Sequence, residues 1–79
     1  MASIFAIRSA RVVGERHLKM WVEVPRTGRT FDAIAFNYAG MAGETTLPQG
    51  SVQLVYRLDV NEYQGEHRLQ LLVDHLLPG

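Results

Sequence analysis

The residues best suited to binding chemistry lie at alternate positions of one apolar segment. His17, Lys19 and Trp21 are each separated by a single residue, so a β-strand would point all three side chains toward one face. An exposed tryptophan beside cations can stack on a base while the cations neutralise phosphates. This spacing favours a nucleic-acid-binding surface.

Further candidates would extend this surface if their strands lie beside the first one. They are polar or aromatic residues on other predicted strands and turns: Arg8, Arg11, Arg57, Asn61, Tyr63 and Gln70. We rank Lys19, Trp21 and Arg57 first among all the candidates. Asn61 precedes a predicted turn, where asparagine is commonly a turn former.

A structural interpretation of the same residues stays open. Trp21 could cover a minor core, and the cations could pair with Glu15, Glu23 or Asp59. Eight Lys and Arg balance eight Asp and Glu, giving a formal net charge of zero, which argues against a strongly basic nucleic-acid binder.

The sequence predicts no metal site, no cofactor and no catalytic residue in this chain. There is no cysteine, and His17, His67 and His75 are widely spaced without a His-Glu-x-x-His pair. No serine stands in a Gly-x-Ser-x-Gly setting, and no glycine-rich phosphate loop is present. The scattered carboxylates are expected to be solvated partners of arginines.

Size and composition are typical of one small globular domain without disulfides. The chain has 79 residues, of which 47% are hydrophobic and 20% charged. No apolar run approaches the roughly 20 residues that cross a bilayer, and the first residues lack the basic start of a signal peptide. The sequence therefore predicts a soluble, cytoplasmic protein without a membrane partner.

Five segments have strand character, and none has a sustained helical period. In residues 4–13 the alternation slips between Ile7 and Arg11, which suggests a bulge or bend. In the second segment the inward face is predicted to consist of Leu18, Met20, Val22 and Val24. Pro25 ends that strand, and residues 26–29 form a hairpin turn.

The remaining strands are assigned by their large apolar residues. In residues 30–37, Ile34 and Phe36 are predicted to face the interior, with the opposite face carrying Phe31, Ala33 and Ala35. The last two strands are joined by a turn at 61–66, and their alternating apolar residues are Val52, Leu54, Tyr56, Leu58 and Val60, then Leu69, Leu71 and Val73.

The strand order predicts an all-β fold. Hairpins link all strands except the third and fourth, which are joined by a Gly- and Pro-containing segment, 38–50, with at most one irregular helical turn. This order matches a five-stranded OB-fold Greek-key barrel with a vestigial helix between strands 3 and 4. An SH3-like barrel is the main alternative. No repeat or linker divides the chain, so 1–79 is predicted to be a single OB-fold domain.

Three blocks of sequence resemble the OB domain of the RecJ exonucleases, in the same order and spacing. They are VGERHLKM at 13–20, DAIAFN at 32–37, and VYRLDVNEYQG at 55–65 followed by LQL at 69–71. Together they cover nearly the whole chain. Trp21 lies between blocks, so only the stacking argument supports it.

The resemblance implies a function and a context. RecJ enzymes are DHH phosphoesterases that degrade single-stranded DNA from the 5′ end with Mn²⁺ or Mg²⁺ in recombination and repair, and their OB domain helps to hold the DNA. This chain has no Asp-His-His run, so the resemblance implies a non-catalytic, C-terminal fragment of a larger exonuclease that contacts its catalytic domains. Within the blocks, the expected barrel residues are Ile34, Phe36, Tyr56, Leu58 and Leu71.

A protein-docking module is the competing hypothesis. The neutral charge and three apolar residues expected on the surface, Trp21, Val55 and Leu72, favour it. Such a module would pack on the catalytic core of its parent enzyme or on another repair protein.

Overall fold

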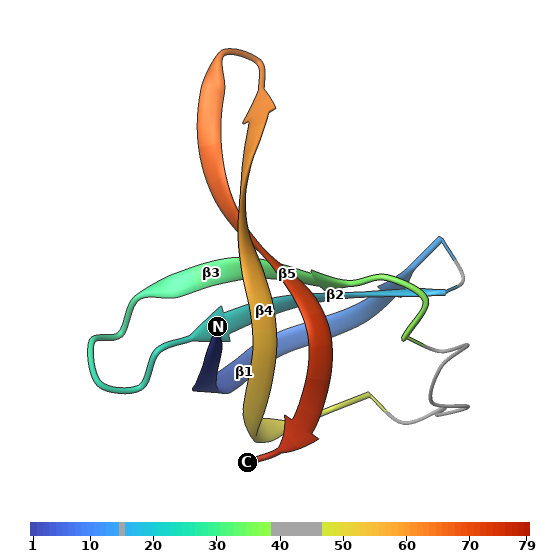
Figure 1. The fold of residues 1–79 in the computed structure, drawn as a ribbon, viewed down its shortest axis with the longest axis vertical. Helices are drawn as coiled ribbons and strands as arrows, with labels where there is room; N and C mark the ends of the chain where they lie inside the picture. Colours follow the sequence, from blue (N-terminus) through green and yellow to red (C-terminus); the bar gives the residue numbers. More distant parts are fainter. Residues whose placement is uncertain (15, 39–46) are drawn as a thin grey trace.

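Five strands close into a β-barrel in the computed structural model, which describes residues 1–14, 16–38 and 47–79, without the side chains of Asn61 and Tyr63. The strands are β1 (Ala2–Val13), β2 (His17–Glu23), β3 (Thr30–Ala35), β4 (Gly50–Tyr63) and β5 (Glu66–Pro78) (Figure 1). They follow the order β1-β2-β3-β5-β4, and β4 returns to pair with β1. Only the β3–β5 pair among them is parallel. The predicted all-β OB-fold barrel is confirmed.

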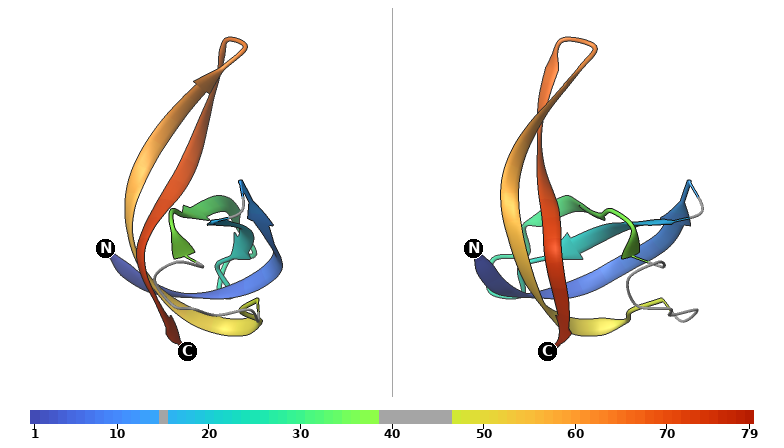
Figure 2. Two further views of the ribbon diagram at one scale, coloured as in Figure 1. Left: turned by 90° about the vertical axis from the view of Figure 1, so that its right-hand side faces the viewer. Right: turned by 45° about the vertical axis from the view of Figure 1, so that its right-hand side comes forward.

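The first strand closes the barrel because it pairs with two neighbours. Its N-terminal part pairs with β4, and its C-terminal part pairs with β2. The β1–β2 register shifts between Ile7 and Ser9, where the sequence predicted a slip. A bulge increases local twist and bends the strand, which allows β1 to curve from one pairing to the other (Figure 2).

The core confirms the predicted inward face of β2. Leu18, Met20 and Val22 are at most 2% exposed. They pack with buried residues from the other strands: Phe5, Ala33, Ala35, Val52, Leu54, Tyr56 and Leu71. Val24 lies beyond the end of β2 and is half-buried against this core.

The predicted facing of β3 is wrong. Ala33 and Ala35 point into the core, whereas Phe36 is 53% exposed in the turn after β3, which ends at Ala35 rather than at residue 37. Ala33 lies opposite Met20, and Ala35 lies opposite the buried Leu18. In the interior of a small barrel, a large side chain from one strand fits only where the neighbouring strand contributes a small one. Side-chain size by itself therefore selected the wrong face.

The β4–β5 hairpin extends beyond the barrel (Figures 1 and 2). β4 pairs with β1 only over residues 50–55, and β5 pairs with β3 only over residues 70–72. Leu58, Val60 and Leu69 are consequently 51%, 61% and 40% exposed, and the prediction that Leu58 fills the barrel is wrong. Alternation selects a face, but no other described part of the chain pairs with this end of the hairpin.

The hairpin ends in a tighter turn than predicted. Glu62 and Tyr63 still pair with His67 and Glu66 across the hairpin, so the turn does not span 61–66. Gln64 and Gly65 have φ angles of 51° and 79°, the conformation of a two-residue type I′ turn.

The predicted vestigial helix falls on the segment 38–50, of which residues 39–46 lie outside the described part of the chain. Among the residues that the structure does describe, no helix combines the length and apolar character needed to cross a membrane.

Candidate nucleic-acid interface

Two rows of outward-pointing residues cross the barrel side by side. In the first, Trp21 lies opposite Ser9 on β1 and Asp32 on β3, and the ladder continues through β5 to β4. We call this the Trp21 row, and it consists of Ser9, Trp21, Asp32, Gln70 and Asp59. Directly opposed residues in an antiparallel ladder have Cβ atoms about 4.5–5.5 Å apart, and the parallel β3–β5 pair links the two antiparallel parts of the row.

The second row lies two residues away along every strand, and thus on the same face. Lys19 lies opposite Arg11 on β1 and Ile34 on β3, and the ladder again continues through β5 to β4. This Lys19 row consists of Arg11, Lys19, Ile34, Leu72 and Arg57. The two rows bring together five of the candidate DNA-binding residues: Arg11, Lys19, Trp21, Arg57 and Gln70.

Two surface hollows flank the indole of Trp21, which is 41% exposed. One, of about 270 Å³, has a rim that includes Ser9, Arg11 and Lys19; we call it the Lys19 groove. The other, of about 310 Å³, is lined by Arg68 and Leu69 among others; we call it the Arg68 groove. Trp21 belongs to both linings and is not part of the buried core. Part of the indole surface is therefore available to a ligand.

The cations near this face differ in their acidic partners. Arg8 pairs with Glu23 at 3.5 Å, one of the pairings that the structural interpretation allowed. Arg68 approaches Asp32 at 3.9 Å. Among the described residues, Arg11 and Lys19 have no acidic partner within ion-pair distance.

Arg57 is held in a specific pair, although not with any of the acidic residues that the structural interpretation named. Its Nε and Nη2 atoms each donate a hydrogen bond of 3.1 Å to the carboxylate of Asp74. Tyr56 lies opposite Val73 and Val55 lies opposite His75, so Asp74 is the extra residue of a bulge in β5. A bulge redirects the side chain of the extra residue, and here it places the carboxylate beside Arg57.

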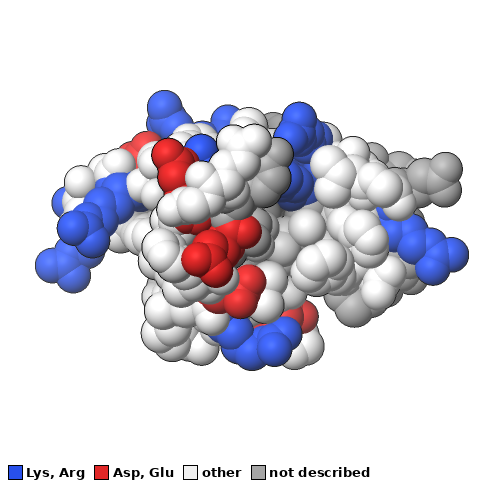
Figure 3. Space-filling view, turned by 90° about the horizontal axis from the view of Figure 1, so that it is seen from above, with Lys and Arg blue, Asp and Glu red and all other residues white. Residues whose placement is uncertain are grey.

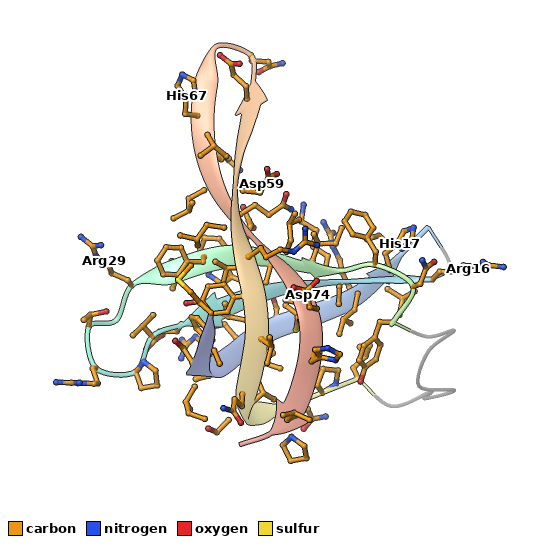
Figure 4. The ribbon with its side chains drawn as sticks, in the orientation of Figure 1. Arg16, His17, Arg29, Asp59, His67 and Asp74 are labelled. Carbon is orange, nitrogen blue, oxygen red and sulfur yellow. The ribbon has the colours of Figure 1, made fainter. Side chains whose placement is uncertain are left out.

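His17 has a structural role that accounts for its half-buried side chain. Its Nδ1 atom accepts a hydrogen bond of 3.0 Å from the backbone N–H of Asn37. Its ring also packs edge-on against Phe36, with centroids 5.1 Å apart. His17 therefore connects the start of β2 to the turn after β3 through these two contacts. In Figure 4 it lies far from the hairpin tip, where His67 is found.

The remaining candidates lie apart from the two hollows. The backbones of Asn61 and Tyr63 lie near the tip of the projecting hairpin, and their side chains are outside the described part of the structure. Gln70 is half-buried between Asp32 and Asp59 in the Trp21 row. In the described residues, no three His, Asp or Glu side chains are placed to hold a metal ion.

Arg68 and Asp32 are two residues of this face that the sequence prediction did not assign to it. Asp32 lies opposite Trp21 in the β2–β3 ladder, and it was missed because the predicted facing of β3 was wrong. Arg68 reaches Trp21 through the parallel β3–β5 pairing, which joins segments far apart in the chain. Only the strand order of an OB-fold barrel would have predicted that contact.

Positive charge is dispersed over the surface. Viewed from above the hairpin, Asp and Glu side chains gather near the centre, with Lys and Arg in separate groups around them (Figure 3). The side of the molecule seen in Figure 3 therefore has no continuous basic tract among the described residues, in agreement with the zero net charge.

Comparison with known proteins identifies the family. The model of the RecJ OB domain matches residues 1–75. The single-stranded-DNA-specific exonuclease RecJ of Dickeya dadantii is 46% identical over 78 residues, and that of Escherichia coli K12 is 42% identical over 78 residues. Each alignment covers 94% of this chain and 13% of the relative, so the chain spans about an eighth of their length. The chain belongs to the RecJ OB-domain family.

Proposed function

We propose that this chain is the single-stranded-DNA-binding OB domain of a RecJ-type exonuclease that degrades single strands in the 5′ to 3′ direction during DNA repair and recombination. The observation that carries the proposal is the position of Trp21 beside Lys19 and Arg11 on the rim of one groove. The printed name of the relatives, single-stranded-DNA-specific exonuclease, supports the choice of ligand.

Each of these side chains has a distinct task in the proposal. The indole of Trp21 stacks on a base, which contributes about 1–3 kcal/mol and works with any base. Lys19 and Arg11 lie across from each other in the neighbouring row, where they contact phosphates of the same strand. Few cations take part, so binding by this domain alone is weak and depends only moderately on salt.

Hydrolysis belongs to the rest of the enzyme in this proposal. Family resemblance implies Mn²⁺ or Mg²⁺ for the whole exonuclease, but the described residues offer no cluster of ligands that fits such an ion. We therefore assign no step that uses a metal to this chain. Its contribution is to hold the strand while the catalytic domains of the same polypeptide cut it.

The proposal is tested by titrating the chain into a fluorescently labelled 12-nucleotide single strand at low salt and following anisotropy. We expect saturable binding that weakens as salt is added, with duplex DNA of the same length bound more weakly. No binding at high micromolar protein would contradict the proposal.

A second candidate function is docking on the rest of the polypeptide, and a different surface favours it. An apolar hollow of about 370 Å³ lies at the base of the projecting hairpin, with Ile4, Leu58 and Leu69 in its lining. These three side chains are 48%, 51% and 40% exposed. Val55 and Leu72, which the sequence suggested for docking, are half-buried rather than fully exposed. Leu72 also lies in the Lys19 row.

Because the relatives are far longer than this chain, we propose that the apolar hollow packs against another part of the same exonuclease. A photoreactive amino acid that replaces Leu58 of this domain within the intact exonuclease should crosslink to its other domains, whereas one that replaces Arg11 should not. The Lys19 groove and the apolar hollow share no lining residue, so one domain can perform both functions. Equal crosslinking from both positions would contradict this assignment.

A further inference from the structure

A carboxylate lies in the middle of the proposed DNA-binding face. Asp32 is directly opposite Trp21 in the β2–β3 ladder. It also belongs to the lining of both the Lys19 groove and the Arg68 groove. Any base that stacks on the indole from either side therefore has Asp32 within reach of its edge.

The carboxylate of Asp32 keeps its capacity to accept hydrogen bonds. Its cationic neighbour, Arg68, stands at 3.9 Å, beyond the 2.7–3.2 Å of a hydrogen bond. Its side chain is 26% exposed. Asp74 shows the contrast, since two hydrogen bonds of 3.1 Å from Arg57 occupy both of its oxygens.

The two rows separate cationic groups from hydrogen-bonding groups. Around the groove, the Lys19 row supplies Arg11 and Lys19, while the Trp21 row supplies the indole and the Asp32 carboxylate. A strand whose phosphates follow Arg11 and Lys19 consequently places its bases over the indole and Asp32. In that register a carboxylate faces a base edge rather than a phosphate, which it would repel.

We propose that Asp32 discriminates between bases at this position and disfavours thymine; this inference rests on the proposed function. An ionised carboxylate is an acceptor only. Cytosine, adenine and guanine present amino groups that donate to it. Thymine presents two carbonyl oxygens flanking its single N–H group, and the carboxylate repels both. The expected preference, measured as the ratio of the dissociation constants for oligo(dT) and oligo(dC), is about fivefold. This value is near the lower end for a base contact because the site is exposed to water.

The test compares oligo(dC) and oligo(dT) of 12 nucleotides at pH 7.5 and low salt, by anisotropy. Both are single-ringed, so the ratio of their dissociation constants reports the base edge. Asp32→Asn should lower the preference for dC over dT about fivefold, because an amide can donate to a thymine carbonyl as well as accept from cytosine.

Asp59→Asn is the matched control. It removes the same charge from the same row, on β4, at a residue that lines neither groove. It should raise affinity for both oligonucleotides and leave their ratio unchanged. Arg68→Gln removes the neighbouring cation but keeps the carboxylate, so overall affinity should fall while the preference for dC persists.

The outcomes separate the two levels of the argument. If the unsubstituted chain binds neither oligonucleotide, the proposed function fails, and the role of Asp32 fails with it. If both bind and Asp32→Asn leaves the ratio unchanged, or Asp59→Asn changes it equally, the role of Asp32 alone is overturned. Circular dichroism of each variant verifies that the barrel is folded.

Discussion

Arg57 donates two hydrogen bonds to Asp74, from Nε and from Nη2, both at 3.1 Å. The pair joins β4 to β5 at the bulge where β5 contributes one extra residue. Sequence alone ranks Arg57 among the strongest DNA-binding candidates, but its guanidinium already has a bidentate partner. A phosphate would have to displace Asp74 to bind there, whereas Lys19 has no acidic partner among the described residues.

The first prediction concerns this difference. Lys19→Ala should weaken binding of a 12-nucleotide single strand about fivefold at low salt, the loss of one exposed charged contact. Arg57→Ala should weaken it less than twofold. Asp74→Asn should strengthen binding slightly, because it releases Arg57 and removes a negative charge. Anisotropy titrations measure all three, and a larger effect of Arg57→Ala than of Lys19→Ala would contradict the prediction.

The second prediction concerns stacking on Trp21, the only tryptophan of the chain. Binding of a single strand should quench the intrinsic fluorescence of the protein. Trp21→Ala should cost about 1–3 kcal/mol of binding free energy, and Trp21→Phe should retain part of it. Because the side chain is 41% exposed, the free energy of unfolding should change far less than it would for a core residue. Unchanged binding by Trp21→Ala would contradict the role of Trp21 as the central residue of the proposed site.

The third prediction concerns salt. Each phosphate neutralised on a single strand contributes about 0.7 to the slope of log K against log salt concentration. The double variant Arg11→Gln, Lys19→Gln should therefore lower the slope by about 1.4. Arg26→Gln, Arg29→Gln is the charge-matched control, in the turn after β2, and should leave the slope nearly unchanged. An equal decrease in both double variants would indicate a general effect of net charge.

The fourth prediction compares two leucines of β4. Leu54 is fully buried and Leu58 is 51% exposed on the projecting hairpin. Leu54→Ala should lower the free energy of unfolding by about 2–5 kcal/mol, because it leaves a cavity in the core. Leu58→Ala should cost less than about 1 kcal/mol. Urea denaturation of both variants checks the difference, and equal losses would mean that the hairpin is packed in solution.

Local patterns in the sequence determined the strands and much of their geometry. The alternation of Leu18, Met20 and Val22 set the inward face of β2, and thereby placed Lys19 and Trp21 together on the outer face. The irregular pattern after Ile7 marked the bulge in β1. These features are predictable because side chains in a strand alternate with a period of two whatever the strand packs against.

Tertiary structure decided what each face meets. Ala33 is buried opposite Met20, and Leu58 is exposed because it lies beyond the part of β4 that pairs with β1 among the described residues. The parallel pairing of β3 with β5 puts Asp32 next to Gln70 and within 3.9 Å of Arg68. Such contacts join residues distant in the chain, and local periodicity carries no information about them. The candidate base-binding residues were therefore predictable from one strand, but the face of β3 that carries Asp32, and the contact of Asp32 with Arg68, became apparent only in the folded barrel.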